Sequence, residues 1–313
     1  MTGSVCANLL KNNGFHPFVI EKSSGLGGRL ATRTVGSLRY FDHGVQYFTY
    51  RSEGFKGFIE KLLNDGGIGR WHPTFSRENV HLNNEWFVGQ PDMNSFIKSL
   101  LDDVEVNLGL EVDSISREGQ RWRIDIHSNK RALLFESVVC TIPAPQLSVL
   151  LSSEKELVSQ ISNVEVAPCW ALLLALENKS NLDFDVWRSD EENIAWISKN
   201  SSKPMRNGGM ECWVVHASPQ WSIKYIEIDK EQIVNLLLDE LRILFGKKFS
   251  NIVFASAHRW RYARTINPLA KPYLCSSDNS LFVGGDWCLG SRVESAYQSG
   301  YAIANALIEN RTK

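Results

Sequence analysis

Residues that could hold a cofactor gather near the end of the chain, between Leu281 and Leu307. A short apolar strand is followed by a Gly-Gly pair ending at Gly285, then by Asp286 and a helix that begins near Val293. Glycine lets the backbone come close to a ligand, and a carboxylate after a strand can bind ribityl or ribose hydroxyls. The backbone of Arg292 and Val293 would present a helix N-terminus to a negatively charged group. The pattern predicts a cofactor-binding strand, turn and helix, although an ordinary α/β unit can have the same pattern.

The N-terminus carries part of a second cofactor pattern. A predicted helix and a short apolar strand lead to Glu21. In a dinucleotide-binding βαβ unit, a G-x-G-x-x-G turn opens the helix, and an acidic residue roughly 20 positions on binds the ribose. Gly3 takes the place of the third glycine, and Glu21 lies at the distance expected of the acidic residue. The first strand and the first two glycines are missing, so we expect a start codon assigned too late or, alternatively, an inactive copy.

A glycine-rich loop follows Glu21, with the sequence GLGGRLAT from Gly25. Gly28 would allow a close backbone approach to a phosphate. The guanidinium of Arg29 would supply charge-assisted hydrogen bonds to a pyrophosphate. The two ends of the chain therefore predict the two halves of one FAD site.

With these motifs in view, the chain resembles the renalase-like FAD-dependent oxidoreductases of the flavin amine oxidase superfamily, which are related to monoamine and polyamine oxidases. The resemblance covers nearly the whole chain. It rests on GLGGRLATR, FDHGVQYFT, GQPDMNSF, VVCTIPAPQLSVLL, WVVHASPQWS, HRWRYA and the C-terminal segment.

The resemblance implies an α/β protein with the two-domain fold of p-hydroxybenzoate hydroxylase and an inserted antiparallel-sheet substrate domain. It also implies non-covalently bound FAD, hydride transfer from a small substrate, and O2 as acceptor. Because renalases oxidise isomers of NAD(P)H, a dihydronicotinamide is the expected substrate. An amine substrate, or an FAD-free inactive copy, is the alternative.

The order of predicted elements indicates a discontinuous domain organisation. A Rossmann-like FAD-binding domain is expected from 1–66, 89–150 and 264–313, and a substrate domain from 67–88 and 151–263. Ligands bind at the carboxyl ends of parallel strands, and Glu21, Asp42, Pro143 and Asp286 all follow predicted strands. Alternating segments at 105–110, 111–117 and 122–127 are expected to pair as hairpins.

Residues of the segment FDHGVQYFT, which follows the loop GLGGRLAT, are expected beside the flavin. Asp42 and Gly44 would contact the cofactor, with Gly44 allowing close backbone approach, and Gln46 or Tyr47 would face the substrate. His43 could act as an acid or base. Hydride removal from a dihydropyridine needs no proton abstraction, however, so a structural role for His43 is favoured.

Aromatic residues in the predicted substrate domain could wall a cavity for a planar ring. The candidates are Trp213, Trp221, Trp260 and Tyr262, although aromatic residues in strands more often pack in the core. His216 ends an apolar strand and is a further cavity candidate. Arg259 and Arg261 would meet substrate phosphates or lie on a solvated strand face, and Glu294 would be functional or merely cap a helix. No residue is assigned a catalytic role with certainty.

Bulk properties exclude several other classes. The 313 residues have a net charge of −1, with 43% hydrophobic and 22% charged residues, which suits a globular protein and gives no reason to expect nucleic acid. No apolar run approaches the roughly 18 residues of a membrane span. The six cysteines form no CxxC pair, so no metal cluster or disulfide framework is expected, and the compartment is predicted to be cytoplasmic.

Overall fold

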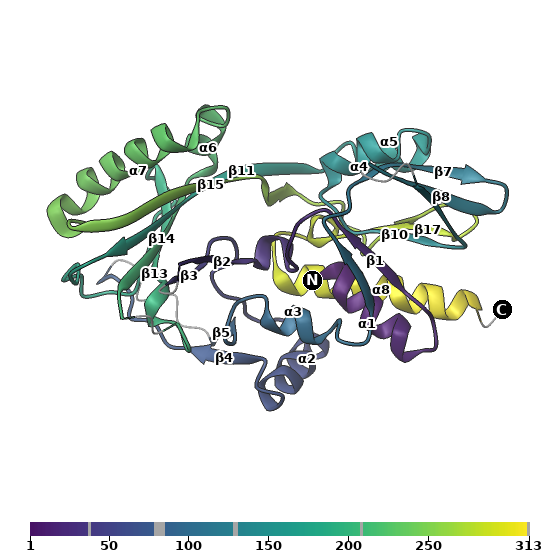
Figure 1. The fold of residues 1–313 in the computed structure, drawn as a ribbon, viewed down its shortest axis with the longest axis horizontal. Helices are drawn as coiled ribbons and strands as arrows, with labels where there is room; N and C mark the ends of the chain where they lie inside the picture. The colour runs from purple at the N-terminus through teal and green to yellow at the C-terminus, as the bar shows by residue number, and fades with distance from the viewer. Residues whose placement is uncertain (37–38, 78–84, 128–130, 207–208, 312–313) are drawn as a thin grey trace.

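The computed structural model describes residues 1–36, 39–77, 85–127, 131–206 and 209–311. Figure 1 shows a part built from helices and parallel strands and, beside it, a large antiparallel sheet. The long strands β11 (Glu165–Leu176) and β15 (Ile252–Asn267) run from one part into the other. The predicted α/β fold with an antiparallel substrate sheet is confirmed, whereas the domain boundaries given above remain a prediction.

The parallel strands form two separate pieces. Strand β1 (Phe18–Glu21) pairs in parallel with β6 (Glu105–Leu108), so the predicted hairpin pairing of residues 105–110 is wrong. Strand β10 (Val138–Cys140) pairs in parallel with β17 (Leu281–Val283), whose other neighbour is the antiparallel β16 (Leu274–Cys275). Among the described residues, no strand pairs with the second edge of β1 or of β10.

Helices α1 (Thr2–Asn12) and α8 (Val293–Arg311) pack closely against each other. A Cβ atom on Gly300 would lie 3.1 Å from the carbonyl carbon of Thr2 and closer still to its oxygen. Apolar side chains complete the contact with β17: Cys6, Leu10, Phe282, Ile303 and Leu307. Gly300 of α8 therefore allows close helix packing, and Ser299 accepts a hydrogen bond from the backbone N–H of Gly285 in the turn after β17.

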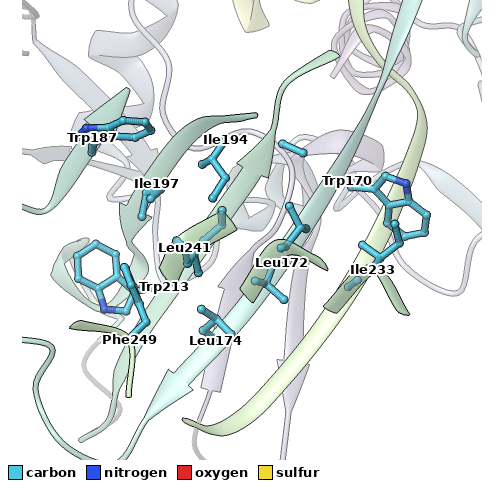
Figure 2. Close-up of a cluster of buried hydrophobic side chains, with 14 of the residues drawn as sticks. Trp170, Leu172, Leu174, Trp187, Ile194, Ile197, Trp213, Ile233, Leu241 and Phe249 are labelled. Atoms are coloured by element: carbon cyan, nitrogen blue, oxygen red, sulfur yellow. The ribbon is translucent and has the colours of Figure 1, made fainter. Parts of the chain in front are cut away.

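The antiparallel sheet has the order β12-β13-β14-β11-β15. Its other strands are β12 (Val186–Arg188), β13 (Ile194–Lys199) and β14 (Glu211–Ala217). Alternate residues of a strand point to opposite faces, so Trp170, Leu172 and Leu174 lie on one face, where α7 (Lys230–Phe245) adds Ile233 and Leu241 (Figure 2). The opposite face is turned toward β3 and Phe41. One face builds the larger core, and part of the other packs on Phe41 in a second buried cluster.

The remaining elements complete the frame around the parallel strands. They are the hairpin β2 (Thr32–Val35) and β3 (Arg39–Asp42), helix α2 (Glu53–Asn64), the pair β4 (Ile68–Trp71) and β5 (Trp86–Gly89), helix α3 (Ser95–Ser99), the sheet β7 (Val112–Glu118), β8 (Arg121–Ile126) and β9 (Arg131–Phe135), and helices α4 (Ala144–Leu150), α5 (Lys155–Ile161) and α6 (Pro219–Lys224). No helix in the described part of the chain has both the length and the apolar character needed to cross a membrane.

Candidate active site and cofactor cavity

A cavity of about 2170 Å³ runs from the N-terminal end of α1 to the antiparallel sheet. Ordinary small-molecule pockets measure roughly 300–1,000 Å³, so this one has room for a dinucleotide together with a substrate. It is lined by most of the predicted site residues: Gly3, Glu21, Gly28, Arg29, Gly44, Gln46, Tyr47, His216, Trp260, Gly285, Asp286, Arg292 and Val293. The structure thus brings both ends of the chain to one cavity, while the ligand that each residue contacts stays a prediction.

Arg29 and Asp286 both line the cavity and form an ion pair. Arg29 Nη1 donates to Asp286 Oδ2 at 2.9 Å, and Nη2 donates to Oδ1. Arg29 Nη1 also donates to the carbonyl of Ala263 at 2.9 Å, and Thr265 donates its hydroxyl hydrogen to Asp286 Oδ2. A guanidinium has five N–H groups, so Arg29 retains donors for an anion in the cavity.

The loop that carries Arg29 is built by glycine. Gly27 and Gly28 have φ angles of +115° and +54°, in the left-handed region that disfavours side chains. No atom lies within 4 Å of the position that a Cβ of Gly28 would take. The backbone of this loop is therefore open toward the cavity beside a cation, which suits a pyrophosphate.

Gly44 packs against the same loop. Val45 donates its backbone N–H to the carbonyl of Arg29 at 2.8 Å. A Cβ on Gly44 would lie 2.9 Å from the carbonyl carbon of Arg29 and would collide with its oxygen. Gly44 was predicted to allow the cofactor to approach the backbone closely. In the structure, the absence of a side chain at Gly44 leaves room for the backbone of Arg29.

Gly3 and Glu21 line the end of the cavity that lies away from the antiparallel sheet. A Cβ on Gly3 would lie 2.7 Å from Thr141 Oγ1, so the beginning of α1 closely approaches the residue after β10. Glu21 ends β1 and accepts a hydrogen bond from the backbone N–H of Ser23 at 2.8 Å. The second carboxylate oxygen of Glu21 has no described protein donor, which leaves it for a ribose hydroxyl. Residues at this end, with Gly28 and Arg29, fit the adenosine diphosphate half of FAD.

Asp42 does not line the cavity, and the prediction that it contacts the cofactor is not supported. Its side chain is fully buried and accepts hydrogen bonds from Thr32 at 2.7 Å, Lys203 at 3.2 Å and Arg206 at 3.0 Å. Burial alone would raise the pKa of Asp42, but the charges of Lys203 and Arg206 hold it below its ordinary value. Strand β3 carries this carboxylate into a buried ionic cluster instead of toward a ligand.

Gln46 lines the cavity, but its amide group belongs to the same cluster. Its Nε2 donates to the carbonyls of Asp42 and Gly44, the latter at 3.0 Å. Its Oε1 accepts from Ser198 at 2.8 Å and from Lys203 at 3.1 Å. Because the amide is fully engaged, Gln46 holds the segment beside the cavity and is a poor candidate for binding substrate.

Lys203 and Arg206 were not found from the sequence. Both side chains are fully buried, and Arg206 also donates to the carbonyls of Gly89 and Pro91. Burial lowers the pKa of Lys203 to about 8. The residues lie in an irregular segment without a motif, so only the fold reveals that they fix the cavity wall.

The register of the antiparallel sheet assembles the substrate end of the cavity. Across the sheet, Trp196 of β13 lies opposite His216 of β14. His216 lies opposite Ala171 of β11, and Ala171 lies opposite His258 of β15. Residues paired across strands share a face, and Trp260 lies two positions after His258 on the same face. Trp196, His216, His258 and Trp260 all line the cavity. Trp196 was missed because β13 carries no local motif, and His258 was not named as a site residue although it begins the HRWRYA segment of β15.

The backbone carbonyl of His43 accepts hydrogen bonds from two of these side chains. It accepts from His216 Nε2 at 3.1 Å and from Trp260 Nε1 at 2.9 Å. The ring of His43 stacks on Trp260, with 4.9 Å between ring centroids, and meets His258 edge-on at 4.6 Å. His43 is itself buried, which agrees with the structural role favoured from the sequence.

The other predicted aromatic residues divide between cavity and core. Tyr47 lines the cavity and stacks on Trp86 at 3.6 Å between centroids, and burial raises its pKa. Tyr262 also lines the cavity. Trp213 and Trp221 instead pack in the core beneath α7, which is the alternative that the sequence favoured for aromatic residues in strands. Both lie on the core face of the sheet or against it, opposite the cavity.

Charged residues at the edges of the cavity are mostly paired. Arg259 and Arg261 line it, and each forms an ion pair with Glu227, at 3.2 Å and 2.7 Å. Arg292 donates to Thr49 Oγ1 at 2.9 Å and lies 3.7 Å from Glu294. Glu294 accepts from the backbone N–H and the hydroxyl of Ser52, the residue before α2, so its role is structural.

The part of the chain that the structure describes contains no cluster of side chains suited to a metal ion. No group of three His, Cys, Asp or Glu residues there could hold a metal ion. All six cysteines are free thiols. The cavity itself has room for an organic cofactor.

Comparison with known proteins identifies that cofactor. The model of the flavin containing amine oxidoreductase family matches residues 51–308, and that of an NAD(P)-binding Rossmann-like domain matches residues 1–62. Renalase of Mus musculus is 24% identical over 325 residues, covering 93% of this chain and 94% of the mouse protein.

Solved structures share the fold at low sequence identity. Cyclohexylamine oxidase from Brevibacterium oxydans has a TM-score of 0.75 at 11% identity, covering 100% of this chain and 97% of the other. An oxidoreductase from Methanosarcina mazei has a TM-score of 0.72 at 12% identity, covering 97% and 98%. The family match spans most of the chain, and the open Gly28 backbone, Arg29 and Glu21 fit FAD. The chain belongs to the flavin containing amine oxidoreductase family and is an FAD-dependent oxidoreductase.

Proposed function

We propose that this protein is an oxidase that removes a hydride from a dihydronicotinamide, an isomeric form of NAD(P)H, and passes the electrons to O2. FAD, when bound, supplies the hydride acceptor. The observation that carries the proposal is the combination of flat aromatic side chains and arginines at the substrate end of one cavity. A nicotinamide ring with its attached phosphates needs both.

Arginines outnumber carboxylates around the substrate end. Five arginines line the cavity: Arg188, Arg259, Arg261, Arg264 and Arg292. Arg259 and Arg261 alternate with Trp260 along β15 and therefore extend from the opposite face of that strand. Three carboxylates form ion pairs with four of them: Asp190, Glu227 and Glu294. No carboxylate among the described residues lies within ion-pair distance of Arg264. A positive field attracts a phosphate-bearing substrate and repels an ammonium ion, so this wall favours a nucleotide over a simple amine.

The histidines of the wall are neutral at physiological pH. Burial lowers the pKa of His216 to about 4 and that of His258 to about 3. Neither adds positive charge near the reacting ring, and neither is needed as a base, because hydride removal from a dihydropyridine leaves no proton to abstract. The chain's own residues orient the substrate and fix the polarity of the cavity.

The test uses the purified protein loaded with FAD. Isomeric dihydronicotinamide nucleotides and simple primary amines are mixed with it separately in the absence of oxygen, and the loss of flavin absorbance is followed. We expect fast bleaching by at least one dihydronicotinamide, and slower bleaching as salt is raised, because exposed charges are screened. Bleaching by amines alone would show an amine oxidase, the second candidate, which the family match favours.

A further inference from the structure

His216 has one ring nitrogen committed and one available. A carbonyl oxygen can only accept, so the hydrogen bond to His43 requires a proton on His216 Nε2. The neutral ring then carries a lone pair on Nδ1. No described residue donates a hydrogen bond to Nδ1, and the side chain lines the cavity. The wall therefore presents an acceptor in a fixed tautomer.

The surroundings of His216 suit a flat ring. Trp196 lies directly opposite it across the sheet, and Trp260 donates to the same carbonyl of His43. Burial keeps the imidazole neutral, with its pKa lowered to about 4, and the nearby charge of Lys203 adds to the effect. An acceptor flanked by apolar rings is suited to an N–H group carried by a planar substrate.

We propose that His216 Nδ1 accepts a hydrogen bond from the carboxamide N–H of the substrate, and thereby selects dihydronicotinamides over dihydronicotinates. This assignment rests on the proposed function. The arginines of the wall by themselves would favour the carboxylate of a dihydronicotinate. A carboxylate has no N–H to donate, and its charge faces the lone pair of Nδ1. A site built around a hydrogen bond rejects an analogue that lacks the hydrogen-bonding group. His216 therefore counteracts the attraction of the arginines for the carboxylate of a dihydronicotinate.

Two substitutions separate the two nitrogens of the ring. In His216→Gln the amide nitrogen takes the place of Nε2 and still donates to the His43 carbonyl, but the acceptor at Nδ1 is lost. In His216→Asn the amide oxygen takes the place of Nδ1, so the acceptor is retained and the anchor is lost. His127→Gln is the matched control, since His127 is exposed and, unlike its partner Asp113, does not line the cavity.

The readouts are kcat and KM with dihydronicotinamide and dihydronicotinate mononucleotides, and Kd for the oxidised products from the change in flavin absorbance. We expect His216→Gln to raise KM and Kd for the amide about 2- to 10-fold, the range of one neutral hydrogen bond, with little change for the acid or in kcat. His216→Asn should restore part of the preference for the amide, and His127→Gln should change neither.

The wild-type protein gives the first decision, which does not depend on any variant folding. If it binds the acid product as tightly as the amide, the assignment of His216 is overturned. If it prefers the amide and His216→Gln keeps the full preference, the assignment is overturned while the proposed function stands. If the wild type neither oxidises a dihydronicotinamide nor binds either mononucleotide, the proposed function fails, and the role of His216 fails with it.

Discussion

Arg29 and Asp286 are 257 residues apart in sequence, yet two parallel hydrogen bonds join their side chains. The guanidinium comes from the glycine-rich loop after β1, and the carboxylate from the turn after β17. Both loops therefore reach the cavity as one unit. The pair orients Arg29 before any ligand arrives, because a bidentate carboxylate fixes the plane of the guanidinium.

Arg29→Ala should weaken FAD binding. Charge-assisted hydrogen bonds contribute about 1.5–3 kcal/mol, which corresponds to roughly a ten- to more than a hundredfold loss of affinity. Arg29→Lys should recover only part of this, because an ammonium lacks the bidentate fork. FAD titrated into each apoprotein, with flavin fluorescence as the signal, gives the affinities. Arg70→Ala, at an exposed ion pair with Glu85, is the control; equal affinities for wild type and Arg29→Ala would remove Arg29 from the site.

Gly44→Ala should destabilise the protein, because the new methyl group would collide with the backbone of Arg29. Overpacking costs about 1–3 kcal/mol, measured as the free energy of unfolding in urea. Gly57→Ala is the matched control, since Gly57 lies in α2 with no atom within 4 Å of its Cβ position. Alanine there should stabilise by about 0.5–1 kcal/mol. A Gly44→Ala variant as stable as wild type would mean that the two loops separate easily.

The sequence could predict which residues line the cofactor end of the cavity because their signals are local. The Gly-Gly-Arg loop and the Gly-Gly-Asp turn each fit within a few residues, and backbone geometry strongly favours glycine at Gly27. The rule that parallel strands present their carboxyl ends at one edge predicts that the two loops meet, and they do so although β1 and β17 lie in separate pieces of parallel sheet. The direct pairing of Arg29 with Asp286 was not predicted, since no spacing rule connects residues so far apart.

The substrate half depends on long-range pairing, and there the predictions were less successful. Asp42 follows a strand, as a ligand-binding carboxylate would, but Lys203 and Arg206 take it into the interior. Trp213 and His216 lie on the same strand, three residues apart and therefore on opposite faces. Only the register of the sheet decides which face meets the cavity, and a single sequence does not contain that register.

Asp42→Asn should be strongly destabilising. Removing one partner from a buried ionic group leaves uncompensated charge and costs about 3–5 kcal/mol, here because Lys203 and Arg206 lose their shared carboxylate. Urea unfolding at pH 7 measures the loss, and Asp239→Asn, in an exposed pair with Arg242, should change the free energy by less than about 1 kcal/mol. The folded-state pKa of Asp42 lies below its ordinary value of 3.8. The excess stability of wild type over the Asn variant should therefore be present above pH 3.8 and fall as pH drops through the folded-state pKa. A small loss of unfolding free energy at pH 7 would show that water solvates Lys203 and Arg206 in the variant.

The pH dependence of stability should report the burial of His216. Its ordinary pKa of 6.5 applies to the unfolded chain, and burial lowers the folded-state pKa to about 4. Between these values the unfolded state binds more protons, so the free energy of unfolding falls as pH drops from 6.5 toward 4. One such group contributes at most about 1.4 kcal/mol per pH unit. His258 titrates in a similar way and is present in both proteins, so the difference between wild type and His216→Gln isolates His216. Urea unfolding at intervals from pH 7 to pH 4.5 should give a flatter curve for the variant. Parallel curves would mean that His216 is solvated when folded, and its neutral lone pair could not then be the fixed acceptor of the cavity wall.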